Sequence, residues 1–263
     1  MPDPPRSTRA SGYWLLRLDG AVFTHGALGF FGAATAEGLR GATFRGIVAT
    51  AAADGYWIVE DQGRIHSFGG AGPVVPLDGP VAAVAPVAGG AWVVSQHGTV
   101  VALGEAPAPP AAGIDAPVVG VAVGGDGAGW VLRRDGHVDA LGEAPLLGSP
   151  AELGAGAVDF VGIAPTQTGH GYWVCGRNGE LFGFGDATFE GSPTADGASV
   201  ADVVGIDATL PGGYALVTAR GNLLPFGAID LGPWQEVAWI PDAAASIVDV
   251  TLVPAPDPGP ANP

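Results

Sequence analysis

The stretch GYWVCGRNGELFGFG, residues 171–185, carries the pattern that decides the fold. Trp173 is followed by Gly179 six residues later and by Gly185 after six more. Five other segments align with this one without a gap, and they begin at Gly12, Gly55, Gly90, Ala128 and Gly213. Their anchor residues are Trp14, Trp57, Trp92, Trp130 and, in the last copy, Ala215. Six copies with anchors 35 to 43 residues apart predict a repeat protein.

Each copy has the features of a β-hairpin. Runs such as YWIV, residues 56–59, are aromatic and β-branched, which favours a strand. The pairs Asp19-Gly20, Asp135-Gly136 and Asn178-Gly179 predict two-residue type I′ turns, in which both central residues need a positive φ. The second strand of each hairpin then ends on the last glycine of the pattern.

Further strands are expected on both sides of the hairpin. An apolar run precedes five of the hairpins, as in residues 44–50 and 202–209, and predicts an inner strand. A short piece follows each hairpin, as in residues 142–149, and predicts an outer strand. Together these segments form a four-stranded antiparallel unit of roughly 40 residues, which is the blade of a β-propeller.

The first copy lacks an inner strand of its own, and the run IVDVTLVP, residues 247–254, can supply it. We therefore predict an all-β fold. It is a six-bladed β-propeller of four-stranded antiparallel blades over residues 12–253, closed by a C-terminal strand that completes the first blade. A flexible N-terminal tail, residues 1–11, and a Pro-rich C-terminal tail, residues 254–263, flank it. Two other all-β folds fit the pattern less well than a propeller. A β-sandwich would not need equal repeats, and a solenoid would need polar capping repeats at its ends.

Charge restricts the classes of partner. The 263 residues carry a formal net charge of -16, and all ten basic residues are arginines. Such a surface repels phosphate backbones and anionic lipid surfaces, so we expect no nucleic-acid partner and no membrane insertion. The absence of lysine excludes Schiff-base chemistry and a Walker-type phosphate lysine.

The N-terminus MPDPPRSTRASG lacks the apolar stretch of a secretory signal, and no segment has 18 continuous apolar residues. We expect cytoplasmic synthesis, followed by retention there or assembly into a larger particle. Export to the cell surface by another route stays open.

The segment GYWVCGRNGELFGFGDATFEGSP, residues 171–193, resembles the GYW/FGDA-type β-propeller repeats of actinobacterial proteins. The resemblance covers about residues 12–253 and is weakest in the sixth copy, where Ala215 stands in the Trp position. The lysine-free composition, rich in Ala, Gly and Pro, is also similar to that of high-GC actinobacteria and their phages. The resemblance implies a propeller module of a surface, secreted or phage-borne protein, and it brings no shared catalytic motif.

Aromatic residues are the first candidates for a binding site. The five repeated tryptophans can be interpreted as a stacking platform for sugars or as packing between blades, and their fixed strand position favours packing. The four tyrosines share one repeat position, and the same argument applies to them. Trp234 and Trp239 lie outside the repeat, in GPWQEVAWIPD, residues 232–242. They are interpreted either as an exposed anchor for a protein partner or as a cover for the closing seam.

Carboxylates are the second group of candidates. Asp159, Asp202, Asp207 and Asp249 fall on the predicted inner strands, which line a propeller's channel. They could surround a cation with oxygen ligands. The sequence has no ligand loop of EF-hand spacing, which favours a solvated channel wall and no bound metal.

The remaining reactive residue types form no catalytic pattern. The histidines are scattered and make no H-x-x-x-H or H-E-x-x-H motif; they are His25, His66, His97, His137 and His170. Cys175 lies within an apolar strand, which predicts a buried, inert thiol. No G-x-S-x-G elbow is present, so we expect no enzyme and no cofactor.

The sequence thus favours a non-catalytic interaction or structural module that docks a protein partner or a larger assembly, at a cell surface, in a virion or in a multisubunit particle. The alternative is a glycan-binding adhesin or lectin of a bacterial surface or phage tail. The residues before the six turn glycines differ in charge and shape, which disfavours repeated identical sugar sites; they are Asp19, Gln62, His97, Asp135, Asn178 and Arg220. A third hypothesis is a metal-dependent lactonase or esterase, for which no metal site or triad can be assembled from the residues.

Overall fold

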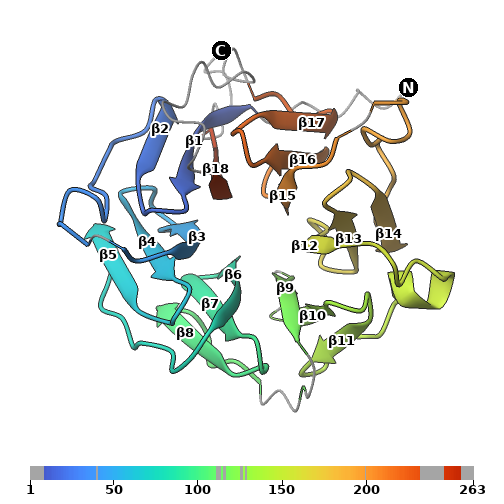
Figure 1. The fold of residues 1–263 in the computed structure, drawn as a ribbon, viewed down its shortest axis with the longest axis horizontal. Coiled ribbons are helices and arrows are strands. Elements are labelled where there is room, and N and C mark those ends of the chain that lie inside the picture. Colours follow the sequence, from blue (N-terminus) through green and yellow to red (C-terminus); the bar gives the residue numbers. More distant parts are fainter. Residues whose placement is uncertain are drawn as a thin grey trace, which may run out of the picture.

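In the computed structural model, the described residues are 9–39, 41–110, 114, 117–124, 127, 129–198, 200–231 and 246–255. They form six three-stranded antiparallel sheets, arranged in a ring around a central axis (Figure 1). We number these blades 1 to 6 in the order of their hairpins. This arrangement fits a six-bladed β-propeller.

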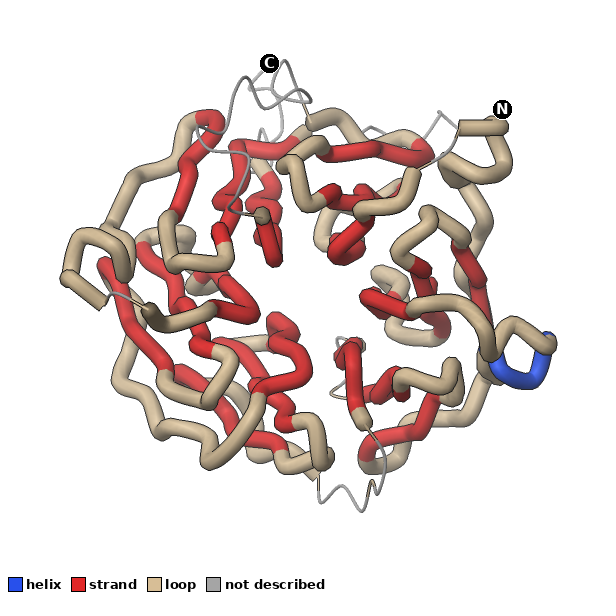
Figure 2. Tube along the Cα trace, viewed as in Figure 1, coloured by secondary structure: helices blue, strands red, loops and turns tan. Residues whose placement is uncertain are grey.

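Each blade has an inner strand next to the axis, a middle strand and an outer strand, as the tube in Figure 2 shows. From blade 1 to blade 6, the inner strands are β18 (Ile247–Pro254), β3 (Phe44–Ala49), β6 (Val81–Val87), β9 (Val118–Val123), β12 (Phe160–Pro165) and β15 (Val203–Asp207). The middle strands are β1 (Ala10–Arg17), β4 (Gly55–Glu60), β7 (Gly90–Ser95), β10 (Gly129–Arg133), β13 (Gly171–Gly176) and β16 (Gly213–Thr218). The outer strands are β2 (Val22–Gly26), β5 (Ile65–Gly69), β8 (Val100–Gly104), β11 (Val138–Leu141), β14 (Leu181–Gly185) and β17 (Leu223–Gly227).

The middle strands form the core. Every residue of β4, β7, β13 and β16 is buried, because a neighbouring blade covers each face of the sheet. An apolar or aromatic side chain can therefore point to either face of these strands, which explains why their sequences are continuous apolar runs without a polar alternation.

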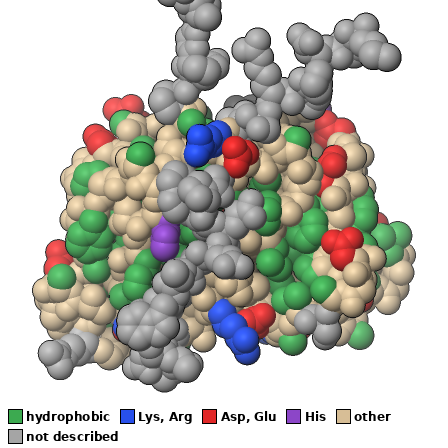
Figure 3. Space-filling model, turned by 90° about the horizontal axis from the view of Figure 1, so that it is seen from above, with side chains coloured by type: hydrophobic (Ala, Val, Ile, Leu, Met, Phe, Trp, Pro, Cys, Tyr) green, Lys and Arg blue, Asp and Glu red, His purple; other side chains and the backbone are tan. Residues whose placement is uncertain are grey.

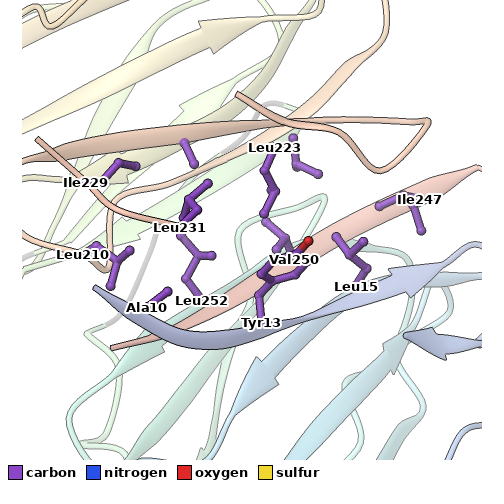
Figure 4. Packing of buried hydrophobic residues seen from close by; sticks show 12 residues of the cluster. Ala10, Tyr13, Leu15, Leu210, Leu223, Ile229, Leu231, Ile247, Val250 and Leu252 are labelled. Atoms are coloured by element: carbon purple, nitrogen blue, oxygen red, sulfur yellow. The ribbon is translucent and has the colours of Figure 1, made fainter. Parts of the chain in front are cut away.

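The two ends of the chain meet in blade 1. Strand β18 pairs with β1, so that Tyr13 lies opposite Leu252 and Leu15 lies opposite Val250. The domain was predicted to span residues 12–253. The pairing begins at Ala10, two residues earlier, and extends to Pro254, one residue later. Figure 4 shows the apolar side chains of β1 and β18 packed against those of blade 6, among them Leu223.

Neighbouring blades are also joined by backbone hydrogen bonds between a hairpin turn and the next inner strand. The Val203 amide donates to the Arg177 carbonyl at 3.1 Å, from blade 6 to blade 5. The Ile247 amide donates to the Ala219 carbonyl at 2.9 Å, and this bond connects blade 1 to blade 6. The seam between the chain ends thus uses the same kind of bond as the interior of the repeat.

The hairpin turns differ from the type I′ prediction. In blade 1 the Gly20 amide donates to the Arg17 carbonyl at 2.8 Å, and the Arg17 amide donates to the Ala21 carbonyl at 2.9 Å. Gly20 has a φ of 82°, whereas Asp19 has no positive φ. This is a three-residue loop, in which a β-turn is followed by a left-handed glycine. The same two bonds recur in all six hairpins, so each turn needs one glycine and leaves the residue before it free to vary.

The predicted fourth strand is wrong for the described residues, since each sheet has three strands. After β11, Gly142 has a φ of 63° and turns the chain away from the sheet. Pro145 and Pro150 follow, and they lack the amide that a strand ladder requires. The outer segment instead touches the hairpin at its far end, where the Ala151 amide donates to the Gly136 carbonyl at 3.1 Å.

Candidate functional site

The six inner strands surround a central cavity of about 300 Å³. Most of its wall is apolar, and Asp207 and Asp249 are the two carboxylates among the described residues that line it. Both are half-buried, because water reaches them through the channel while protein surrounds them on the other sides.

Asp249 joins two blades. It occupies a repeat position at which other inner strands carry Gly46, Gly120, Gly162 and Gly205. Its Oδ2 accepts a hydrogen bond of 2.9 Å from the Ile47 amide of blade 2. Burial raises the pKa of this carboxyl to about 7, and the charge of Asp207 adds to the effect.

Asp207 has a similar role at the preceding seam. Its Oδ2 accepts a hydrogen bond of 3.1 Å from the Leu252 amide of blade 1, and its Oδ1 accepts one of 2.7 Å from the Thr209 amide. Burial also raises the pKa of the Asp207 carboxyl above its ordinary value. The two channel carboxylates therefore hold together blades 6, 1 and 2, where the chain ends meet.

Asp159 and Asp202 lie elsewhere and have cationic partners. Asp159 lines the mouth of the channel, where its Oδ2 accepts a hydrogen bond of 2.7 Å from Arg177. The carboxylate of Asp202 lies 3.6 Å from the guanidinium of Arg220. The four predicted aspartates thus do not surround one point, and no group of three or more His, Cys, Asp or Glu residues suited to a metal occurs in the described part of the chain.

The repeated tryptophans are part of the core, so the stacking-platform interpretation is wrong. Their exposed fraction is at most 7%, as for Trp173. Each indole Nε1–H donates to a backbone carbonyl fifteen residues later, at 2.8 to 3.1 Å; the acceptors are Gly29, Gly72, Pro107, Pro145 and Thr188. Each tryptophan therefore fixes the loop that follows its own hairpin.

Three of the four repeated tyrosines fix the same kind of loop from the next blade. Tyr214 of blade 6 donates its hydroxyl proton to the Gly191 carbonyl at 2.6 Å and accepts a bond of 3.1 Å from the Glu190 amide. Tyr56 donates to the Gly32 carbonyl, and Tyr172 donates to the Gly148 carbonyl. The ring of Tyr214 also packs against Trp173, with 5.2 Å between centroids.

A large apolar residue lies between these two attachments in three blades. Phe30, Leu146 and Phe189 each follow the carbonyl that accepts the tryptophan bond, and their exposed fractions are 58%, 71% and 53%. They share one repeat position, four residues after the last glycine of the pattern. The sequence shows this position, but only the structure shows that the side chain points outward.

Apolar and acidic side chains both reach the surface on one side of the ring. Figure 3 views the side of the ring on which the chain ends lie, and hydrophobic side chains reach the surface there between scattered acidic and few basic groups. Trp234 and Trp239, predicted as a partner anchor, lie outside the described residues. No described helix is long and apolar enough to cross a membrane.

Cys175 is confirmed as a buried thiol. It is fully inaccessible in β13, and burial raises its pKa to about 12. Two histidines have acidic neighbours: His66 Nε2 lies 2.8 Å from Glu60, and His137 Nδ1 lies 3.2 Å from Asp135. The second pair belongs to a cluster in which Arg133 binds both Asp135 and Asp139. Within the described residues, neither histidine is part of a group of three or more residues suited to a metal.

No protein-family model matches the chain. No curated protein matches its sequence significantly. Solved structures do resemble it, among them the β-propeller domain of Cps50 (Swd1) from Myceliophteria thermophila, with 10% identity, a TM-score of 0.50 and coverage of 79% of this chain and 71% of that one. The fold is that of a β-propeller. Another similar structure is YCF48 bound to D1 peptide, with 12% identity, a TM-score of 0.50 and coverage of 98% of this chain and 95% of that one. At these identities the likeness concerns the fold alone.

Proposed function

We propose that this chain is a non-catalytic β-propeller that docks a protein partner. The observation that carries the proposal is the exposure of Phe30, Leu146 and Phe189 at one repeat position. Large apolar side chains that are exposed on fixed loops are suitable anchors for a protein partner. Similar propellers support the proposal, since YCF48 is described in complex with a peptide.

The loops that carry these residues are suited to binding. The tryptophan of the same blade holds the residue before each apolar side chain, and the tyrosine of the next blade holds the residues after it. A side chain on a fixed loop loses little conformational entropy when a partner covers it, so more of the buried apolar area contributes to affinity.

Isolation of the tagged chain from its native source, with chemical cross-linking, tests the proposal. We expect a partner that co-elutes in constant ratio, with cross-links on the loops around Phe30, Leu146 and Phe189. The triple variant Phe30→Ser, Leu146→Ser and Phe189→Ser should lose the partner and keep its fold. A chain that stays alone, or a partner that the triple variant retains in full, would contradict the proposal.

A further inference from the structure

One surface groove between blades 4 and 5 differs from the rest of the rim. It has a volume of about 680 Å³, and its floor contains the half-buried side chains of Val158, Leu181 and Phe182. Two strongly exposed apolar residues stand on its sides: Leu153 with 67% and Phe189 with 53% of the side chain exposed. Large apolar residues that share one groove and remain open to solvent mark an interaction site.

Leu153 departs from the repeat in a way that makes one side of this groove apolar. It ends the short helix η1 (Pro150–Leu153), directly before Gly154, which has a φ of 80°. The corresponding turns of blades 1 and 5 end on Glu37 before Gly38 and on Asp196 before Gly197, with φ values of 76° and 74°. An acidic residue fits this turn in two copies, so the fold itself does not require leucine there.

Both sides of the groove are rigid. The Ser149 amide donates to Glu152 Oε2 at 3.1 Å, and the Gly154 amide donates to the Ala151 carbonyl at 3.1 Å, which fixes the turn that carries Leu153. On the opposite side, Trp173 holds the carbonyl of Thr188, next to Phe189. The apolar pair is therefore preorganised for a ligand.

The charge around the groove is negative. Glu180 is the one charged residue among the described residues that line it. Glu152, Glu190 and Asp196 are exposed and adjacent in sequence to lining residues. An occupant with positive charge on either side of its apolar residues is complementary to this rim.

Charge also argues against an occupant from this chain. A second copy carries the same net charge of -16 and would be repelled. Segments 232–245 and 256–263 contain acidic residues and no basic ones, and segment 1–8 contains one of each, Asp3 and Arg6. None of them supplies the positive charge that the rim favours.

We infer that the groove formed by Leu153 and Phe189 binds a peptide segment of a partner protein, in which two large apolar side chains are flanked by Lys or Arg. This inference rests on the proposed function. It names the surface that binds the partner and the kind of residues that the partner presents. The apolar side chains of the peptide cover Leu153 and Phe189, and its basic residues lie over the acidic rim.

Selection of random 12-residue peptides on phage against the immobilised full chain tests the inference. We expect enriched peptides with two large apolar residues and a positive net charge. Fluorescence polarisation with the synthetic peptides should show affinity that falls about tenfold or more with Leu153→Asp or with Phe189→Ser. Phe30→Ser changes the same repeat position in blade 1, and it should leave the affinity within about twofold.

We expect Leu153→Asp to leave the fold intact, because blade 5 carries Asp196 at the same place in the turn. Circular dichroism and tryptophan fluorescence should match those of the unchanged chain. Affinity should also fall as salt rises, since the rim contributes by charge.

Several outcomes would overturn the inference. These are peptides that bind Leu153→Asp and Phe189→Ser at full strength, enrichment of acidic peptides, or no enrichment at all. A dimer that Leu153→Asp dissociates would assign the groove to a second copy. If removal of residues 1–8 raised the peptide affinity tenfold, the N-terminal segment would be the occupant of the groove, because it would compete with the peptide. The proposed function is tested separately. It stands in each of these cases if the partner isolated from the native source is lost from the triple variant Phe30→Ser, Leu146→Ser and Phe189→Ser.

Discussion

Replacement of Asp249 by Asn tests the role of the channel carboxylate at the seam between the chain ends. Asn keeps the size of the side chain and an oxygen that can accept the bond from the Ile47 amide, but it carries no charge. In the folded chain, burial raises the pKa of Asp249 from its ordinary 3.8 to about 7. The folded state therefore binds the proton more tightly than the unfolded state does, and the ionised carboxylate destabilises the fold as pH rises from about 4 to about 7.

The size of the effect follows from the difference between these pKa values. Each pKa unit corresponds to about 1.4 kcal/mol, so Asp249→Asn should raise the free energy of unfolding by about 1–2 kcal/mol at pH 5 and by about 3–4 kcal/mol at pH 8. The lower pH is kept above the isoelectric point of about 4.3, where the chain would lose solubility. The gain should stop growing above pH 8, because both states are then ionised.

Urea unfolding followed by tryptophan fluorescence at pH 5, 6, 7 and 8 measures the effect, since the repeated tryptophans are buried in the folded chain. Asp202→Asn is the matched control: this aspartate flanks β15, is partly exposed and lies beside Arg220, so the change should stay within about 0.5 kcal/mol. A gain for Asp249→Asn that is equal at pH 5 and pH 8, or a loss of stability at pH 8, would refute the argument that burial of a charge at this position destabilises the fold.

Four further predictions concern the blades themselves. Tyr214→Phe removes the bond to the Gly191 carbonyl and should lower the free energy of unfolding by about 1–2 kcal/mol in urea; an unchanged midpoint would contradict the role of this hydroxyl. Ala215→Trp restores the repeat consensus but overfills a position with no exposed area, so we expect a loss of about 1–3 kcal/mol rather than a gain. Cys175 should resist a thiol reagent such as DTNB in the native chain and react fully in urea; rapid native labelling would show that β13 is open. A chain that ends at Ser246 lacks β18 and should lose its cooperative unfolding transition in calorimetry, because β1 then has no inner partner.

Much of the fold was predictable because the repeat constrains it. The spacing of Trp173, Gly179 and Gly185 gave the hairpin, and the structure places a strand on each side of the turn. The turn type was predicted wrongly, since a glycine after an Asp or Asn is compatible with both a two-residue and a three-residue loop. The backbone bonds that separate the two, such as that from Gly179 to the Gly176 carbonyl, exist only in the folded hairpin.

The fourth strand was predicted wrongly for a related reason. Residues 142–149 have a composition that suits an edge strand or a loop, and the sequence does not show whether a neighbour lies close enough to pair. The left-handed Gly142 directs this segment away from β11. Its attachment instead comes from the side chains of Trp130 and Tyr172, which bind its backbone carbonyls.

The candidate site was the least predictable part. Asp159, Asp202, Asp207 and Asp249 all fall on the predicted inner strands, yet two of them bond to neighbouring blades and two lie beside arginines. The repeat separates Asp159 and Asp202, which begin their inner-strand runs, from Asp207 and Asp249. It does not show what each position contacts, because the partners belong to other blades or to other strands.

By itself the sequence determined the number of blades, the hairpin of each blade and the strand that the C-terminus adds to the first hairpin. These depend on local patterns of glycine and apolar residues, which the chain carries wherever it lies in space. The tertiary structure alone decided which apolar residues are covered. Trp173 and Phe189 are both aromatic residues at repeated positions, but a neighbouring blade buries the first, while the second lies on a fixed loop beyond the reach of any described blade. Exposure depends on what packs against a side chain, and that is settled only when six separate sheets come together in a ring.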